Sequence, residues 1–386
     1  MPTKERARKS NGRNDETGAI RYAVIGLGWI AQSAVLPAFA RARRNSKLEA
    51  LVSDDDTKLK VLGRKYKVDK LYSYDELDRC LADPELDAVF IALPNTMHRT
   101  YTEAAARAGK HVLCEKPMAM TEQDCRSMID TCKNADVRLM VAYRLHFEKA
   151  NLAAAELVQS GRIGEPRIFD SVFVNDVEQG NLRLRAGEGG PLFDIGIYCV
   201  NAARSLFRAE PVEASAWHES RSGDPRFADV PELTAARLRF PDDRVASFVC
   251  SFGGSSASQY QVVGTKGVLC LDPAYSIGED LVHSLTIKDK TTTRTFPGRD
   301  QFAAELMAFS DCVLNDSEPE PSGEEGLADV RVLEALDESA KNGGRTVKLS
   351  PFKRSRYPGM DQEESRPKGR KTRLVHAEDP KRATTA

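Results

Sequence analysis

IRYAVIGLGWIA, residues 20–31, is an apolar run that leads directly into a glycine-rich turn. The run predicts a buried strand over residues 20–25, and the apolar spacing beyond the turn predicts a helix over residues 29–43. A turn of the form G-x-G-x-x-A between a strand and a helix is typical of a dinucleotide-binding loop. The first glycine permits the tight bend, the second lets the backbone approach a pyrophosphate, and the small last residue lets helix and strand pack closely. Its members are Gly26, Gly28, Trp29, Ile30 and Ala31.

Short apolar runs then alternate with amphipathic stretches as far as residue 142. Strands that alternate with helices imply a parallel sheet covered on both faces, so residues 19–144 are predicted to form a doubly wound α/β domain, a Rossmann domain. The runs predict strands over residues 48–52, 88–92, 111–114 and 139–142, and the stretches predict helices over residues 58–66, 96–108 and 121–135.

The pattern changes after about residue 164, where β-like runs follow one another without helices between them. Such a series favours an antiparallel sheet. We therefore predict an α+β domain over residues 145–350, built on a large, mostly antiparallel open sheet, and its last two helices are candidates for packing back on the first domain. The clearest runs are 212–218, 234–240, 245–252, 259–263 and 268–271, and the helical segments are 190–207, 301–314 and 323–341.

The composition is that of a globular protein of two domains, with 386 residues, 41% of them hydrophobic, and a net charge of −1. This charge provides no field to gather nucleic acid or anionic lipid. No stretch approaches the roughly 20 apolar residues that span a bilayer, and the polar N-terminus lacks the apolar segment of a secretion signal. The eight cysteines show neither a CxxC pair nor zinc-ligand spacing. We expect a cytoplasmic protein with reduced cysteines and no metal.

Both ends of the chain are polar and highly charged. Residues 1–18 and 351–386 contain few large apolar side chains. Such segments cannot bury enough surface to offset the entropy lost on ordering, so we predict that both are disordered. The basic residues of the C-terminal segment would also suit nucleic-acid contact, but a solvated tail is the favoured interpretation.

Residues 53–60, SDDDTKLK, follow the second predicted strand and should meet the adenosine ribose of a bound dinucleotide. An acidic residue there favours NAD through the 2′-hydroxyl, whereas cationic residues favour the 2′-phosphate of NADP. Ser53, Lys58 and Lys60 indicate NADP, and Asp54 is the candidate ribose ligand of an NAD enzyme. The aspartates are also explained as caps of the following helix. NADP is therefore the expected cofactor.

Two groups of polar residues are candidates for catalysis. Lys116 follows the strand over residues 111–114, at the edge where parallel sheets bind ligands. Beside a cationic nicotinamide ring its pKa would fall, and it would hydrogen-bond a substrate hydroxyl; the alternative is a surface lysine. Asp194 and Tyr198 share one helical face, where they would hold a hydroxyl and carry its proton. The alternative for this pair is a helix cap and a core aromatic residue.

Taken in order, these motifs resemble those of the Gfo/Idh/MocA oxidoreductases, and most closely the glucose–fructose oxidoreductase branch. The resemblance extends from about residue 20 to residue 349. It implies hydride transfer between NAD(P) and a sugar or sugar-like alcohol, in a homodimer or homotetramer formed through the open sheet. It is carried by GLGWIA (26–31), ALPNTMH (92–98), HVLCEKP (111–117), YR (143–144) and DIGIY (194–198).

The resemblance also implies roles for single residues. Lys116 would contact the reacting hydroxyl, Asp194 would position the substrate, and Tyr198 would act as acid and base where much of the family has His. The implied cofactor contacts, besides the glycine loop, are Ser53, Lys58 and Lys60 at the 2′-phosphate, Pro94, Asn95 and His98 at the nicotinamide, Glu115 and Lys116 in the Glu-Lys-Pro motif, and Arg144 between cofactor and sugar.

The sequence also departs from the best-known member of that branch. It has no match to that member's export signal or to its proline-rich N-terminal arm, and the loop over residues 183–188 is short. One alternative function is an oxidoreductase that retains NADP and couples oxidation of one sugar to reduction of another. A second is a catalytically silent regulator that senses NADP or a sugar on the same fold. The intact Lys116, Asp194 and Tyr198 favour an enzyme.

Overall fold

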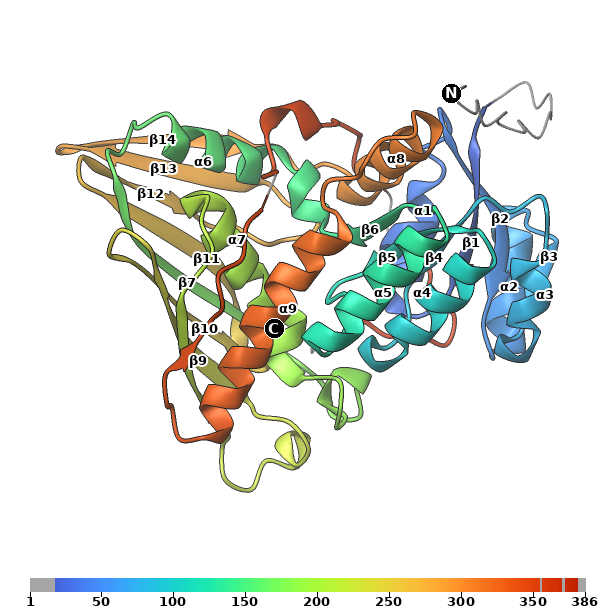
Figure 1. Ribbon diagram of the computed structural model, residues 1–386, viewed down its shortest axis with the longest axis horizontal. Coiled ribbons are helices and arrows are strands. Elements are labelled where there is room, and N and C mark those ends of the chain that lie inside the picture. Colours follow the sequence, from blue (N-terminus) through green and yellow to red (C-terminus); the bar gives the residue numbers. More distant parts are fainter. Residues whose placement is uncertain (1–17, 355, 370–371, 381–386) are drawn as a thin grey trace, which may run out of the picture.

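The computed structural model describes residues 18–354, 356–369 and 372–380, which form two domains side by side (Figure 1). The disorder predicted for residues 1–17 lies outside the described residues. Among the described helices, none combines the length and the apolar character needed to cross a membrane. The same residues contain no group of three or more His, Cys, Asp or Glu placed to hold a metal ion. All eight cysteines are unpaired, and six of them are buried.

The first domain is built on a six-stranded parallel sheet in the order β3-β2-β1-β4-β5-β6, which confirms the predicted doubly wound fold. The central strands are apolar throughout because helices cover both faces. The strand order reverses between β1 and β4, and ligands of such sheets bind beside that point, at the carboxyl ends of the strands. The strands are β1 (Ile20–Ile25), β2 (Ser46–Val52), β3 (Lys70–Tyr72), β4 (Ala88–Ile91), β5 (His111–Glu115) and β6 (Leu139–Ala142).

The helices of this domain follow the prediction, with two differences. The helix expected over residues 29–43 ends earlier, at Ala38. It consists of a π-helical turn, η1 (Ala31–Val35), followed by the short α1 (Leu36–Ala38). The short β3 and α3 (Leu77–Leu81) were not predicted, since so few residues carry no readable periodicity. The remaining helices are α2 (Asp56–Tyr66), α4 (His98–Arg107) and α5 (Glu122–Asn134).

The second domain is built on a nine-stranded open sheet in the order β14-β13-β12-β11-β7-β10-β9-β8-β15. All neighbours pair antiparallel except β10 and β7, so the predicted mostly antiparallel sheet is confirmed. Helices α6 (Lys149–Gln159), α7 (Ile197–Phe207) and α9 (Gly323–Lys341) lie on one face (Figure 1). The strands are β7 (Pro166–Asp176), β8 (Glu213–Glu219), β9 (Leu233–Phe240), β10 (Arg244–Ser251), β11 (Gly253–Gly264), β12 (Gly267–Leu271), β13 (Leu281–Ile287), β14 (Lys290–Phe296) and β15 (Val347–Lys348).

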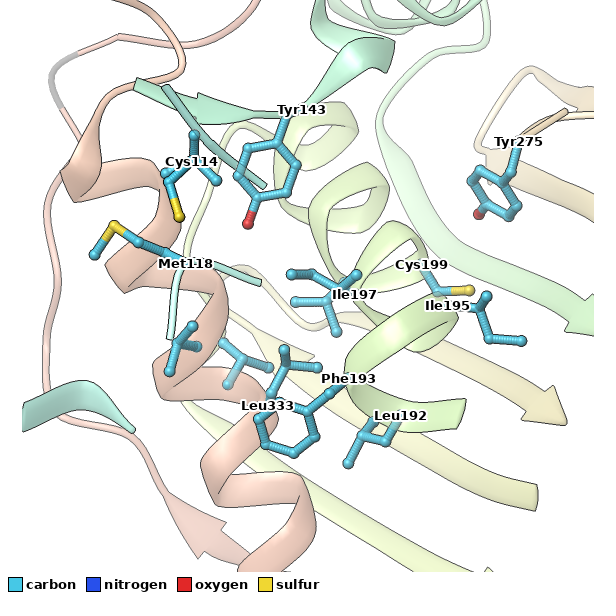
Figure 2. Close-up of a cluster of buried hydrophobic side chains, with 14 of the residues drawn as sticks. Cys114, Met118, Tyr143, Leu192, Phe193, Ile195, Ile197, Cys199, Tyr275 and Leu333 are labelled. Carbon is cyan, nitrogen blue, oxygen red and sulfur yellow. The ribbon is translucent and has the colours of Figure 1, made fainter. Parts of the chain in front are cut away.

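The last two helices join the domains. Helix α8 (Gln301–Leu314) packs on the first sheet, where the Tyr22 hydroxyl lies 2.7 Å from the Ser310 hydroxyl and Asn45 Nδ2 donates to the Met307 carbonyl at 2.9 Å. Helix α9 packs between α5 and β8. Figure 2 shows one apolar cluster shared by the two domains. It includes Cys114 and Met118 of the first domain, Ile197 of α7 and Leu333 of α9.

The C-terminal segment is ordered against both domains wherever it is described, in contrast to the disordered tail expected for residues 351–386. The side chain of Arg354 is only 3% exposed and pairs with Glu320 at 2.9 Å and Glu325 at 2.6 Å. The dark-red chain then passes the short helix η8 (Met360–Gln362) beside α6 (Figure 1). Composition misled the prediction because this segment is held by hydrogen bonds and ion pairs instead of an apolar core.

A buried ionic cluster lies where α7 meets α9. The Arg204 guanidinium is fully buried and pairs with Glu210 at 2.7 Å, with Glu325 at 3.1 Å, and with Asp329. Burial raises the pKa of Asp329 to about 6, although Arg204 opposes the shift. A charged group in such a place is tolerated only while its partners remain, so this cluster fixes how the two helices dock.

Candidate active site

The glycine loop has the geometry that a pyrophosphate requires. Gly26 closes β1 with φ +92°, and a Cβ at this position would lie 2.4 Å from the Ala92 carbonyl oxygen. At Gly28, no described atom lies within 4 Å of where a Cβ would be, so the backbone is open there. Ala31 is fully buried, and the helix begins at Trp29. The open loop and the helix N-terminus together fit a dinucleotide pyrophosphate.

The two glycines are therefore expected to respond differently to substitution. Gly26→Ala should lower the free energy of unfolding by more than about 1 kcal/mol, because it combines a positive φ with a backbone clash. Gly28→Ala should leave that free energy unchanged and weaken nucleotide binding, because its methyl group would occupy the pyrophosphate's place. Urea unfolding and nucleotide titration of both variants separate the two effects. Equal unfolding curves for the two variants would contradict the assignment.

The acidic run after β2 caps the next helix. Asp55 is the N-cap of α2 and accepts from the Lys58 amide at 3.0 Å, and Asp54 accepts from the Tyr74 amide at 3.2 Å. Ser53 is only 5% exposed, and its hydroxyl accepts from the Asp55 amide at 3.2 Å. The capping interpretation of Asp55 is thus confirmed. Lys60 is exposed on the first turns of α2 and pairs with Asp56 at 3.4 Å.

Lys116 and Asp194, which are far apart in sequence, form a hydrogen-bonded ion pair. Lys116 stands at the carboxyl end of β5, and its Nζ donates to Asp194 Oδ1 at 2.9 Å and to the Asp194 carbonyl at 2.8 Å. Asp194 belongs to η6 (Leu192–Gly196), the π-helical turn that leads directly into α7, and this turn places the carboxylate beside the lysine. Arg183 donates to the other carboxylate oxygen at 2.8 Å. Although burial would raise it, the pKa of Asp194 is held far below its usual value by Lys116 and Arg183.

The depressed pKa that is expected for Lys116 beside a bound nicotinamide ring stays a prediction. Within the protein, burial is the largest single influence and would lower the pKa of the lysine, but Asp194, Tyr198 and Glu115 together outweigh it and raise the pKa above its usual value. Lys116 is consequently an ammonium group that donates hydrogen bonds at neutral pH. The peptide bond between Lys116 and Pro117 is cis.

Tyr198 lies beside the same ion pair. Its hydroxyl accepts from Arg144 Nε at 3.2 Å, and Lys116 Nζ lies 5.1 Å from the centre of its ring. Arg144 is only 4% exposed and is fixed by Gln301 Oε1 at 2.6 Å and by the Tyr275 carbonyl at 2.6 Å. The structure therefore brings Lys116, Asp194, Tyr198 and Arg144 into one cluster at the carboxyl edge of the first sheet.

Comparison with known proteins agrees with this geometry. Residues 20–143 match the model described as the oxidoreductase family with an NAD-binding Rossmann fold, and residues 151–270 match the Gfo/Idh/MocA C-terminal domain. The chain belongs to the Gfo/Idh/MocA family. It is thus an NAD(P)-binding oxidoreductase, as the motifs indicated.

Several Gfo/Idh/MocA relatives resemble the chain over most of its length. An NADP-dependent D-xylose 1-dehydrogenase of Haloarcula marismortui is 32% identical, with 86% of this chain and 93% of that protein covered. A 1,5-anhydro-D-fructose reductase of Ensifer adhaerens is 30% identical over 70% of this chain and 82% of that protein. The crystal structure of an aldose–aldose oxidoreductase from Caulobacter crescentus, complexed with glycerol, matches with TM-score 0.81 and 39% identity and covers 86% of this chain and all of that one.

Two loops of this Gfo/Idh/MocA protein are tied together across the domains. Asn95, which follows Pro94 after β4, donates from its backbone amide to Glu188 Oε2 at 2.8 Å and from its side chain to the Glu188 carbonyl at 2.9 Å. Thr96 donates to the same carboxylate at 2.9 Å. The short loop over residues 183–188 is thereby fixed between Asp194 and the β4 loop.

His98 does not face the open site, in contrast to the nicotinamide contact that the resemblance implied. It is fully buried, with one ring nitrogen 2.8 Å from the Pro117 carbonyl and the other 2.9 Å from the Leu93 carbonyl. Burial lowers its pKa. His98 thus joins the β4 loop to the Glu-Lys-Pro loop and supports the position of Lys116 from behind.

Three further charged residues of the site were not predicted as individual site residues, although Arg183 and Glu188 belong to the short loop over residues 183–188 that the sequence pointed to. Arg183 lies in η5 (Leu182–Leu184), a single 3₁₀ turn in that loop that is too short to give a readable periodicity. Glu305 is fully buried on α8, and neither of its carboxylate oxygens has a hydrogen-bond partner among the described residues. Glu188 lies in the same loop as Arg183. The charge of Glu115 contributes to the raised pKa of Glu305, after the larger effect of burial. Burial also raises the pKa of Glu115 itself to about 7, although the positive charge of Lys116 opposes the shift.

Proposed function

We propose that the protein is an NADP-dependent sugar dehydrogenase or reductase. The observation that carries the proposal is the cluster of Lys116, Asp194 and Tyr198 at the carboxyl edge of the sheet that bears the glycine loop. Relatives named for activity on D-xylose and on 1,5-anhydro-D-fructose support a sugar as the substrate. The NADP specificity named for the xylose enzyme supports the choice of cofactor.

The residues present fit such a cofactor. Gly26, Gly28, Trp29, Ile30 and Ala31 would surround the pyrophosphate, where the space at Gly28 is open. Ser53, Lys58 and Lys60 would meet the 2′-phosphate. Pro94, Asn95, Glu115 and Arg144 would border the nicotinamide half. NADP⁺, when bound, supplies the hydride acceptor.

The chain's own residues would then handle the substrate hydroxyl. In the oxidative direction, the phenolate form of Tyr198 would take the proton of the hydroxyl whose carbon gives up a hydride to the nicotinamide, and would become a neutral phenol. Lys116 donates a hydrogen bond to the substrate oxygen, and Asp194 keeps the lysine charged and aimed. Arg144 and Lys116 lie beside the tyrosine, where their positive charges would stabilise the phenolate before it takes the proton. In the reductive direction the same groups return the proton.

Mixing the protein with NADP⁺ or NAD⁺ and a panel of aldoses tests the proposal. We expect nicotinamide absorbance to rise with NADP⁺ and at least one aldose. Absence of reduction with every aldose, together with no sugar-dependent oxidation of NADPH, would contradict it.

Cofactor preference gives a sharper test at the end of β2. Ser53→Ala combined with Lys58→Ala should raise the Kd for NADP⁺ by about 10- to 100-fold, because charge-assisted hydrogen bonds to the 2′-phosphate would be lost. Binding of NAD⁺ should stay unchanged. Arg64→Ala, in the last turn of the same helix, is the matched control for removal of a positive charge. An equal loss for both cofactors would place the 2′-phosphate elsewhere.

A second candidate is an enzyme that retains NADP and couples oxidation of one aldose to reduction of another. It is favoured by the similarity to the Caulobacter aldose–aldose oxidoreductase. Stoichiometric NADP in the purified protein, with aldose-dependent product formation and no added cofactor, would identify it.

The open sheet is proposed to form a homodimer or homotetramer. Its face opposite the helices exposes apolar side chains that include Ile168, which is 47% exposed, and Val249, which is 37% exposed. Light scattering coupled to size-exclusion chromatography should give at least twice the mass of one chain, and Ile168→Lys combined with Val249→Lys should lower it.

A further inference from the structure

The end of the C-terminal segment lies against the glycine loop. The Val375 amide donates to Gln32 Oε1 at 2.8 Å, and Gln32 Nε2 donates back to the Val375 carbonyl at 2.8 Å. The Thr372 hydroxyl donates to the Gln32 carbonyl at 3.0 Å. Gln32 Nε2 also donates to the carbonyl of Leu27, between the two loop glycines, at 2.9 Å. One buried glutamine therefore fastens the segment to the loop.

The same segment reaches the adenosine end of the cofactor site. His376 Nδ1 lies 2.8 Å from Oδ2 of Asp55, the N-cap residue of α2. Asp55 is two residues after Ser53 and three before Lys58 in the sequence, so the His376 ring lies close to both. These are the residues proposed to meet the 2′-phosphate. His376 is exposed, and its imidazole brings a further hydrogen-bonding group to the corner that contains Lys58 and Lys60.

Farther on, the segment crosses to the other domain. The Glu178 amide donates to the Pro380 carbonyl at 3.4 Å, in the loop that leads to Arg183. Residues 372–380, the C-terminal strap, thus bridge from α2 and the glycine loop to the substrate domain. The strap leaves the space beside Gly28 open, since no described atom lies within 4 Å of a Cβ built there.

We propose that the C-terminal strap completes the nucleotide site and encloses the adenosine half of NADP, with His376 as a ligand of the 2′-phosphate. This inference rests on the proposed NADP-dependent function. A bound nucleotide would lie between the glycine loop and the strap, so it could leave only after the bonds between Gln32 and Val375 open. The strap therefore slows cofactor release and gives the 2′-phosphate an additional partner.

Two substitutions separate these effects. Val375→Pro removes the amide that donates to Gln32, and we expect it to speed dissociation of both NADPH and NADH by about 10-fold, because a released strap no longer encloses either nucleotide. His376→Ala should speed release of NADPH by about 10-fold and leave NADH unchanged, since only NADPH carries the 2′-phosphate. His376→Lys should restore slow NADPH release. Lys353→Ala, an exposed charge in the C-terminal segment before the strap, is the control.

Stopped-flow displacement of prebound NADPH or NADH, followed by nicotinamide fluorescence, measures these rates in the full-length protein. Hydrogen–deuterium exchange of residues 372–376, with and without NADP⁺, provides a second readout, and NADP⁺ should protect them. Tight NADPH binding with unchanged release in both variants and no protection would overturn the strap and leave the proposed function standing. Failure of the unaltered protein to bind NADPH at all would overturn both.

Discussion

Lys116→Ala is expected to lower kcat by about 10²- to 10⁴-fold while NADP binding is retained. In the proposed mechanism, the ammonium group is the donor that the ion pair with Asp194 aims at the substrate oxygen. Without it, the hydroxyl would lose its hydrogen bond in the transition state, and Asp194 would keep Arg183 as its charged partner. Initial rates at saturating aldose, with the Kd for NADP⁺ measured in parallel, test this expectation.

Lys110→Ala is the matched control, because Lys110 lies at the opposite end of β5. It is also largely buried, with 9% exposure, and its Nζ donates to the carbonyls of Asp83 and Leu86 at 2.8 Å. Its loss should lower stability and leave the turnover of the folded protein intact. If both lysine variants lose turnover to the same extent, the effect of Lys116 is on folding and its catalytic role is wrong.

Arg204→Met should lower the free energy of unfolding by about 3–5 kcal/mol, since it leaves Asp329 buried without its paired cation, while Glu325 keeps only Arg354 among the described arginines. Arg239→Met, which breaks an exposed pair with Glu213, is the control and should unfold like the unaltered protein. Urea unfolding of both variants gives the comparison.

The loss caused by Arg204→Met should also depend on pH. A carboxyl group whose pKa is raised on folding ionises more easily in the unfolded chain than in the folded protein. As pH rises above the unfolded-state pKa, the folded state therefore loses stability, and the loss is complete above the folded-state pKa. The pKa of Asp329 is raised to about 6 even with Arg204 present. Removing the cation raises it further, so the deficit of the variant should be larger at pH 8 than at pH 5. A deficit independent of pH would show that the lost packing of the side chain, and not the charge, is responsible.

The first sheet was predictable because its signals are local. The strand over residues 20–25 matches β1 at both ends, and the turn that follows needs glycine at Gly26 for reasons visible in a short stretch of sequence. Parts of the second sheet gave no such signal. Strand β14 reads KTTTRTF and is exposed almost throughout, so its alternation is absent. Strand β7, which pairs with β10 and β11, depends on neighbours far along the chain.

The site divides in the same way. Lys116, Asp194 and Tyr198 belong to motifs, and the sequence alone picked them out. The place of Arg183 in the site depends on its hydrogen bond to Asp194, which lies in another element. The place of Glu305 depends on the packing of α8 against the first sheet, which the local sequence does not reveal. The strap was misjudged because its composition is that of a solvated chain, whereas paired backbone groups at Gln32 hold it in place.

Helix α8 has a consequence for how the protein is made. The first sheet contains residues 20–142, yet part of one face is covered by a helix that ends at Leu314. A ribosome must therefore translate most of the chain before the nucleotide-binding half has its complete core. Until then, the apolar side chains that await Phe302 and Phe309 stay exposed to chaperones and to one another. A fragment that stops near residue 144 would retain that exposed surface permanently and would be prone to aggregate.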